Sequence, residues 1–234
     1  MKKIKYARLI LEGALTLEQV PAFRAAIART ARHHKELFHH HEEENKLLYR
    51  YPLIQFKSLQ DAPAVVALEQ GAEALMEFLE HKPSILRLHH TTLPFKVSQI
   101  HLRQHLLQVW NKSFPFSLQN WLALNKDNLA RYRSTPSLVE RVRLLERILT
   151  AHILAFAEGV QWNVEKTIQV TITHIHRQRL LKYKRVNWQA FDLTFLSNVS
   201  LPEAIGLGKS PSVGFGIVRR MRTLPSKDEG SPQA

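Results

Sequence analysis

The chain of 234 residues contains no cysteine. It therefore has no disulfide bond, no thiolate ligand for zinc and no cysteine nucleophile, and it suits a reducing cytosol. No segment reaches the ~18 consecutive apolar residues of a membrane-spanning helix. Lys2 and Lys3 resemble the basic start of a secretory signal, but Glu12 and the polar helix predicted after it exclude a long apolar run. We expect a cytoplasmic protein without a membrane partner.

Acidic residues are also scarce. The chain has 20 Asp and Glu against 33 Lys and Arg, a formal net charge of +13. Because 44% of the residues are hydrophobic, this excess belongs to a folded protein with a real core and not to a basic disordered tail. Such a charge points to a polyanionic partner, nucleic acid first and an anionic membrane surface second.

Glycine is rare, yet four of the eight glycines fall within residues 206–216. Two G-x-G pairs, Gly206 with Gly208 and Gly214 with Gly216, flank a centre that contains Lys209 and Ser210. Glycine permits positive φ and close backbone approach, and successive N–H groups in such a loop can bind anionic oxygen. With Arg219 and Arg220 on the strand-like run that follows, we predict a phosphate-holding loop at a sheet edge. A glycine-rich hairpin turn with ordinary basic flanks is the alternative, and neither common nucleotide-loop motif fits.

The first half alternates strands and helices in the order β-α-β-β-α-β, the ferredoxin-like pattern. The predicted elements are strands at 3–12, 48–57 and 62–69, helices at 17–32 and 71–81, and an extended stretch at 85–97. Thr16-x-x-Gln19 is a capping box for the first helix. Alternation puts Tyr49, Tyr51, Gln55 and Lys57 on one strand face, and Pro52 suggests an edge strand or a bulge.

The second half is richer in long helices, so we expect an α+β protein. The predicted elements are helices at 117–133 and 137–158, strands at 164–176, 186–196 and 213–221, and an undecided strand or helix start at 98–110. Residues 177–185 are predicted to be a basic connector. The predicted domains are 1–96, carrying the histidine cluster, and 97–224, carrying the glycine loop, followed by a mobile tail at 225–234.

Histidines concentrate at residues 33–41. Imidazole titrates near ~6.5, so it can exchange protons at neutral pH. In RNA the 2′-OH can attack the adjacent phosphate, a reaction that needs only a general base and a general acid, with a phenol or a cation to steady the charge. Tyr49 and Lys57 follow the cluster on one strand face. A solvated polar turn is the alternative. The run lacks a zincin spacing, so we expect adventitious nickel or zinc binding but neither a dedicated metal site nor a cofactor.

The basic connector is a second candidate nucleic-acid surface, with a solvated hairpin tip as its ordinary explanation. Its candidate RNA-binding residues are Arg177, Arg179, Lys182, Lys184 and Arg185. Its value depends on its lying beside the glycine loop. The four tryptophans are expected to pack in the core, because no aromatic motif for base stacking accompanies them.

Three segments together resemble one family: HHHEEENKLLYRYPLIQFK, WLALNKDNLARY with LLERILTAHILAFAEGVQW, and LSNVSLPEAIGLGKSPSVGFGIVRR. They are similar to the repeat-processing endoribonucleases of CRISPR systems, the sixth CRISPR-associated family, b-type branch. The resemblance implies two ferredoxin-like (RRM-like, RAMP) domains in tandem, the second modified with long helices. It also implies a prokaryotic source and metal-independent cleavage of precursor CRISPR RNA, which leaves 2′,3′-cyclic phosphate or 3′-phosphate and 5′-hydroxyl ends.

The resemblance also assigns residues. The family's H-x-H element falls on His39 and His41, with Tyr49 as the phenolic helper, while His40 and Tyr51 stay in reserve. The glycine pattern falls on the four loop glycines, which shape the RNA-contacting face. Val213 departs from the pattern, because a basic residue commonly precedes the second glycine pair, and Lys209 is a candidate replacement for that contact.

The leading hypothesis is thus a histidine-dependent endoribonuclease that binds CRISPR repeat RNA, with His39 and His41 as acid and base in undecided order and Lys57 stabilising the phosphorane. One alternative is a non-catalytic RNA-binding subunit of a CRISPR effector complex. Another is a metal-dependent nuclease that uses the His/Glu run. Effector subunits and a second copy of the chain are candidate partners.

Overall fold

The computed structural model describes residues 1–31, 51–89, 91–183 and 186–222. His39, His40, His41, Tyr49 and the predicted tail at 225–234 lie outside the described residues. Within the described ranges, none of the helices is both long enough and apolar enough to cross a membrane.

The first half of the chain forms a four-stranded antiparallel sheet in the order β2-β3-β1-β6. Its elements are β1 (Lys2–Leu11), η1 (Leu17–Gln19), α1 (Val20–Thr30), β2 (Ile54–Leu59), β3 (Ala62–Leu68), α3 (Gln70–Glu80) and β6 (Val97–Leu107). This strand order and the predicted β-α-β-β-α-β sequence define the ferredoxin-like fold. The capping box is present at η1, where the Gln19 side chain accepts a hydrogen bond from Thr16 N at 2.9 Å.

The closing strand of this sheet is β6 and not the predicted stretch at 85–97. Residues 85–94 instead form a separate hairpin of β4 (Ile85–Leu88) and β5 (Thr91–Pro94). β6 pairs with β1 along nearly its whole length, so the first sheet continues to Leu107, past the boundary predicted after residue 96. Most of β6 is exposed, and the sequence prediction for residues 98–110 leaves a strand and a helix start open.

The second half builds another four-stranded antiparallel sheet, in the order β10-β7-β9-β8. Its elements are β7 (Val109–Trp121), α4 (Lys126–Ser134), α5 (Leu138–Gly159), β8 (Val170–Tyr183), β9 (Val186–Val199) and β10 (Ile217–Arg220). Two predictions are corrected here. Residues 117–121 end strand β7 and do not start a helix, and residues 177–183 continue strand β8 and do not form a connector.

The second sheet repeats the topology of the first, with one replacement. If the strands of each sheet are numbered 1 to 4 along the chain, both sheets have the spatial order 4-1-3-2. Between β9 and β10, however, where the ferredoxin-like pattern has its second helix, the chain contains the irregular segment 200–216. The glycine loop (residues 206–216) is therefore the substitute for a helix.

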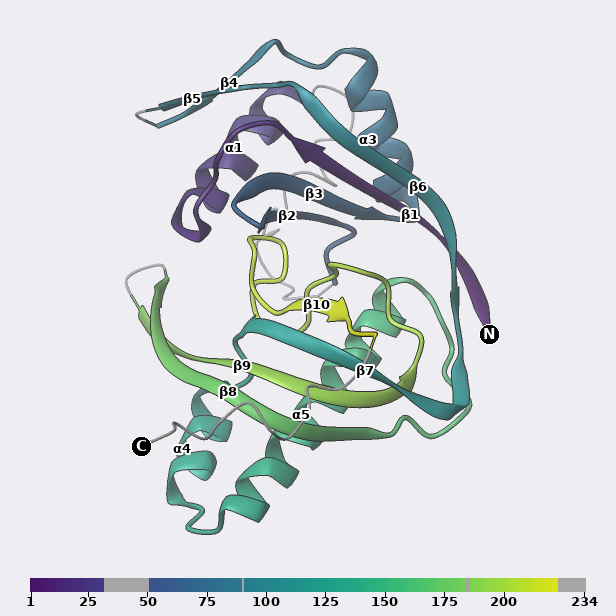
Figure 1. Cartoon of the computed structure of the whole chain (residues 1–234), viewed down its shortest axis with the longest axis vertical. Coiled ribbons are helices and arrows are strands. Elements are labelled where there is room, and N and C mark those ends of the chain that lie inside the picture. Colours follow the sequence, from purple (N-terminus) through teal and green to yellow (C-terminus); the bar gives the residue numbers. More distant parts are fainter. Residues whose placement is uncertain (32–50, 90, 184–185, 223–234) are drawn as a thin grey trace, which may run out of the picture.

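The two sheets face each other, with the glycine loop and β10 between them (Figure 1). Helices α1 and α3 pack on the outer face of the first sheet through Ala7, Leu9 and Leu11 of β1. The other face of β1 contributes Ile4 and Tyr6 to a core that it shares with the second sheet and α5. The fold is thus a tandem pair of modified ferredoxin-like units with a common core, and the glycine loop lies at their junction.

Candidate functional site

The glycine loop is held by side chains of residues 51–57, which come after the histidine-rich residues 33–41 in the chain. Tyr51 Oη donates to Gly206 O at 2.8 Å, and Gln55 Oε1 accepts from Gly206 N at 2.8 Å. Lys57 Nζ donates to Pro211 O at 2.8 Å. All three side chains are buried. Alternation predicted that they share one face, and the glycine loop covers that face.

Backbone pairing continues this contact. Phe56 N donates to Ser212 O at 3.0 Å, and Phe56 forms a short parallel bridge with Val213. β2 is an edge strand of the first sheet, as Pro52 suggested, and the glycine loop covers part of this edge. Val213, the position that departs from the family pattern, is fully packed here, so a basic side chain at this point would be buried.

Two of the loop glycines are required because other atoms of the protein lie very close to their backbone. At Gly216, with φ +64°, an added Cβ would lie 1.8 Å from Leu207 O. At Gly208, with φ +92°, it would lie 2.8 Å from Trp121 Nε1. Both positions combine left-handed backbone with contact against fixed atoms, which only glycine tolerates. The prediction of special backbone geometry in this loop is confirmed.

Many of the loop's N–H groups are bonded inside the protein. Gly206 N donates to Gln55 Oε1, Leu207 N to Gly216 O and Lys209 N to Leu122 O. Val213 N donates to Ser210 O, and Gly216 N donates to Asn120 O. These groups are not free to bind an anion. The loop fastens the two units together, and the polar groups that it leaves partly exposed include the side chains of Lys209, Ser210 and Ser212.

A cavity of about 190 Å³, called here the loop cavity, lies beside this loop. Its lining residues are Tyr51, Pro52, Ala123, Asn125, Asn128, His152, Ala155, Gly208, Lys209 and Pro211. His152 Nδ1 accepts a hydrogen bond of 3.2 Å from Trp121 Nε1. Burial, assisted by the positive charge of Lys209, lowers the pKa of His152 to about 4, so the ring is neutral at neutral pH.

His152 was not singled out from the sequence. It lies three residues after Leu149 and four before Phe156, on the apolar side of α5. A polar residue on the apolar side of a helix suggests a specific role. That role depends here on the hydrogen-bond partner Trp121, which is 31 residues away in the chain. Lys209 is also fixed, because its ammonium lies 4.4 Å from the centre of the Trp188 ring.

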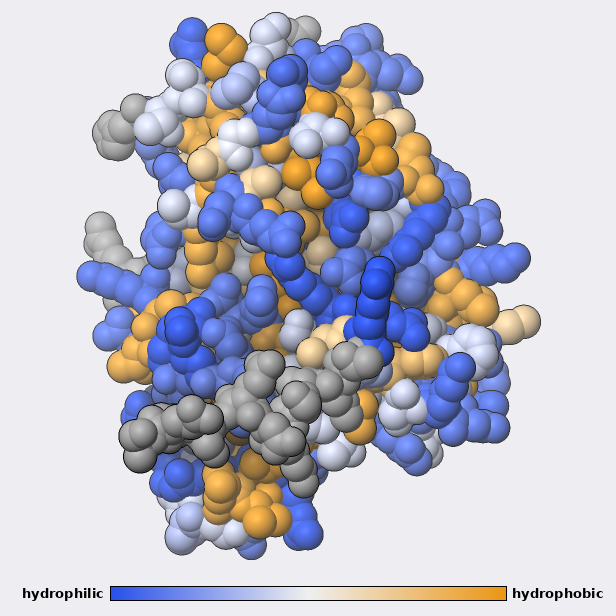
Figure 2. Space-filling view, in the orientation of Figure 1, coloured by the Kyte–Doolittle hydropathy of each residue, from blue (hydrophilic) through white to orange (hydrophobic). Residues whose placement is uncertain are grey.

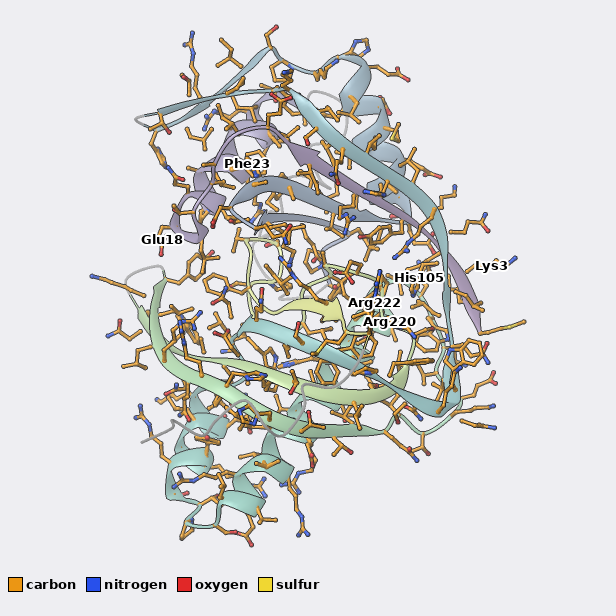
Figure 3. All side chains as sticks on the ribbon, viewed as in Figure 1. Lys3, Glu18, Phe23, His105, Arg220 and Arg222 are labelled. Carbon is orange, nitrogen blue, oxygen red and sulfur yellow. The ribbon has the colours of Figure 1, made fainter. Side chains whose placement is uncertain are left out.

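A second cavity, of about 270 Å³, opens between the two sheets. Five of its lining residues define what is called here the basic groove: Arg8, His101, Arg103, His105 and Arg220. Tyr6, Leu201 and Glu203 complete the lining, so Glu203 is the single acidic residue there. Figure 3 shows His105 and Arg220 at this junction, and in Figure 2 hydrophilic side chains extend across the middle of the same face.

The β1–β6 register explains the convergence of these charges. Arg8 is opposite His101 and Tyr6 is opposite Arg103, so their side chains share one sheet face. None of the ion pairs found among the described residues includes Arg8, Arg103 or Arg220. Arg8 Nε is buried, and none of the described residues forms a hydrogen bond with it. Uncompensated cations held close together are suited to an anionic ligand.

Family models match both halves of the chain. The Cas6b N-terminal domain matches residues 2–106, and the Cas6b C-terminal domain matches residues 108–221. The chain belongs to the Cas6b family. The predicted resemblance is confirmed, and so is the α+β fold of two tandem ferredoxin-like units.

The chain is also similar to individual proteins and solved structures. An uncharacterised protein of Methanocaldococcus jannaschii is 31% identical over 101 residues, which cover 43% of this chain and 67% of that protein. A crystal structure of Cas6b superposes with a TM-score of 0.84 at 22% identity, over 94% of this chain and 100% of the other. A structure described as a CRISPR RNA processing endoribonuclease Cas6b gives 0.72 at 22% identity, with the same coverage. At these identities the two structures establish the fold.

The described basic residues of this Cas6b family member fall into distinct environments. Arg177 and Lys182 are exposed on β8. Arg179 is not free, because its guanidinium pairs with Asp192 and donates to Asn120. The end of β8 does reach the glycine loop, where the Tyr183 and Phe215 rings lie 5.1 Å apart. Arg219 is partly buried and Arg220 is exposed, while Lys184 and Arg185 lie outside the described residues.

Lys57 requires a correction. We predicted that its ammonium stabilises the phosphorane, but the side chain is fully buried and its nitrogen donates to Pro211 O. Burial lowers the pKa of Lys57 to about 7. The strand alternation was correct, but the face that carries Lys57 is turned to the glycine loop and not to solvent. Lys57 supports the loop and has no exposed surface with which to contact a phosphate.

This burial has a measurable consequence for stability. Between a folded-state pKa of about 7 and the ordinary 10.5, the folded protein binds fewer protons than the unfolded chain. Raising the pH through this window therefore favours folding, by up to ~1.4 kcal/mol per pH unit. We expect the unfolding free energy of the wild type to rise with pH from 7 to 9 relative to that of Lys57→Met, and the difference to be flat below 7.

Denaturant unfolding at pH 6, 7, 8 and 9 measures this difference. Lys3→Met, which removes an exposed lysine of β1, is the matched control and should follow the wild type. A wild-type-minus-Lys57→Met difference that stays constant from pH 7 to 9 would mean that the buried ammonium keeps its proton.

Proposed function

We propose that this protein is a metal-independent endoribonuclease that binds CRISPR repeat RNA and cuts precursor CRISPR RNA within each repeat. Membership of the Cas6b family supports the proposal, and one of the similar structures is described as a CRISPR RNA processing endoribonuclease. The observation that carries it is the bond from Tyr51 to Gly206. It fastens Tyr51, ten residues after His41 in the chain, to the glycine loop, beside a cavity that is lined by His152 and Lys209.

The reaction is an internal transesterification. A general base takes the proton of a 2′-OH, whose oxygen attacks the adjacent phosphorus, and a general acid gives a proton to the departing 5′-oxygen. The products are a 2′,3′-cyclic phosphate and a 5′-hydroxyl. We assign the two proton transfers to His39 and His41, in an order left open, and His40 remains the reserve.

Tyr49 is the phenol that we assign to this chemistry, in preference to Tyr51. Burial raises the pKa of Tyr51, and its hydroxyl already donates to Gly206 O. A proton committed to a structural hydrogen bond in the interior is not available to a leaving group. Tyr51 therefore acts as an anchor of the glycine loop.

The basic groove is the surface that we assign to the RNA backbone. It brings three arginines and two histidines together from β1, β6 and β10, across the junction of the two units. Phosphate contacts by such residues dominate the affinity of RNA-binding proteins and make it dependent on salt. Arg177 and Lys182 on β8 are further candidates for backbone contacts.

Incubation of a labelled repeat RNA with the protein in excess EDTA tests the function. We expect one cut within the repeat, with a 5′ fragment whose 2′,3′-cyclic phosphate resists phosphatase until acid opens the ring. Cleavage that requires a divalent cation would favour the metal-dependent alternative. Tight binding without any cleavage would favour a non-catalytic RNA-binding subunit of an effector complex.

A further inference from the structure

The loop cavity has the dimensions and walls of a site for one flat, uncharged ring. Its volume of about 190 Å³ is below the ~300–1,000 Å³ of pockets for drug-sized ligands, so it takes a fragment and not an entire nucleotide. Pro52, Ala123, Ala155 and Pro211 give it rigid or small apolar walls. Such walls favour an aromatic ring and disfavour a charged group, which would lose its hydration.

The polar atoms of the cavity are few and fixed. Because His152 Nδ1 accepts from Trp121 Nε1, the neutral ring carries its proton on Nε2, and no described residue accepts from that nitrogen. Asn125 Oδ1 accepts from Asn128 N, which leaves the Asn125 amide nitrogen as a donor. Lys209 adds an ammonium. Donors of hydrogen bonds therefore predominate over acceptors.

We propose that the loop cavity binds one unpaired nucleobase of the RNA, with His152 Nε2–H and Lys209 donating to acceptor atoms on the base edge; this rests on the function proposed above. Guanine fits this donor set best, because its O6 and N7 are adjacent acceptors. A phosphate fits less well, since the cavity offers a single ammonium and mostly apolar walls, against which a charged group would lose its hydration.

Two walls of the cavity come from segments that are far apart in the chain. Tyr51 and Pro52, from the first half of the chain, form one wall. Gly208 and Lys209 form another wall, and Lys209 N is fixed by Leu122 O at 3.2 Å. A base held between these walls would contact residues from both halves of the chain.

A double perturbation of protein and RNA tests the proposal. Ala155 lines the cavity and is exposed, so Ala155→Met fills the cavity without entering the core. Ala151→Met makes the same change one turn earlier on α5, outside the cavity lining. Affinities are measured for the intact repeat and for repeats with a single abasic nucleotide at each position in turn.

For the wild type and for Ala151→Met we expect one abasic position to weaken binding on the order of tenfold or more. Ala155→Met should bind the intact repeat as weakly as the wild type binds that abasic RNA, and should lose nothing further on it. Arg103→Gln, in the basic groove, should weaken both RNAs by the same factor. An Ala155→Met variant that binds as the wild type does, or that loses affinity equally on both RNAs, overturns the proposal.

Two substitutions of His152 separate its hydrogen bond to the base from its support of Trp121. His152→Asn keeps an acceptor near the Nδ1 position but removes the donor in the cavity, whereas His152→Gln keeps a donor near the Nε2 position. We expect about threefold to tenfold weaker binding of the intact repeat by His152→Asn, and closer to wild-type binding by His152→Gln. Equal binding by the two variants contradicts the proposed hydrogen bond.

The outcome also separates this proposal from the proposed function. If a methylphosphonate linkage, and no abasic position, couples to Ala155→Met, the cavity holds a phosphate and the base proposal is wrong while the nuclease proposal stands. If the wild type neither binds nor cuts the intact repeat, the proposed function itself fails.

Discussion

Replacement of both His39 and His41 by alanine should reduce the single-turnover cleavage rate of repeat RNA by on the order of a thousandfold or more, because general acid and general base catalysis each contribute ~10²–10⁴-fold. Binding should persist, since we assign affinity to the basic groove and the loop cavity, which the two substitutions leave intact. Rates are measured in EDTA with the protein in excess, and affinity is measured on a repeat with a 2′-deoxy nucleotide at the cut.

The single substitutions sharpen this result. In the wild type, one general base and one general acid give a bell-shaped dependence of rate on pH. Removal of the base should abolish the acidic limb and removal of the acid the alkaline limb, which would assign the order left open between His39 and His41. His33→Ala with His34→Ala is the matched control, because it removes two neighbouring histidines outside the H-x-H element. A double variant of His39 and His41 that cuts at the wild-type rate rules out the mechanism.

Gly216→Ala should destabilise the protein by at least ~3 kcal/mol, the range of strained backbone positions and of the severe point mutations. The added Cβ would lie 1.8 Å from Leu207 O and 2.8 Å from the carbonyl carbon, both backbone atoms. Relief of this clash requires the loop to move, which breaks the hydrogen bond from Leu207 N to Gly216 O. Denaturant unfolding of the purified variant measures the loss.

Gly214→Ala is the matched control, because Gly214 also has positive φ (+93°) but its added Cβ would meet only side-chain atoms of Leu17 and Val20, at 3.0 Å or more. We expect it to cost about 1 kcal/mol. Equal stabilities for Gly214→Ala and Gly216→Ala would show that positive φ alone, and not the clash with Leu207, sets the requirement for glycine.

Periodicity and apolar runs predicted the buried elements of the fold. α3 and α5 were placed within two residues of their observed ends because apolar residues recur on a single face of each. β1 and β3, whose side chains pack into both cores, were placed equally closely from their apolar runs. For residues 98–110 the prediction left a strand and a helix start open, and the structure shows the strand β6, most of which is exposed. The start of α4 was placed too early, because residues 117–121 end β7 and α4 begins only after its N-cap Asn125, whose side chain accepts from Asn128 N.

The sequence predicted which segments contribute to the site better than it predicted which way their side chains face. Glycine spacing located the junction loop, and alternation placed Tyr51, Gln55 and Lys57 on one face. Neither pattern says whether such a polar face meets solvent or a partner more than 150 residues away, which is how Lys57 was misassigned. Arg8, Arg103 and His152 were missed for the same reason, because their importance comes from register and packing and not from a local motif.

The long-range anchoring of the glycine loop also constrains how the protein is made. Gln55 and Lys57 leave the ribosome with the first sheet, but their partners Gly206 and Pro211 are 151 and 154 residues further along. Until those residues are synthesised, the nascent chain presents unsatisfied polar groups on a surface meant for the interior. Translation must therefore be almost complete before the first half reaches its final stability, and a split between β6 and β7 should yield two fragments that recover the fold only when they are combined.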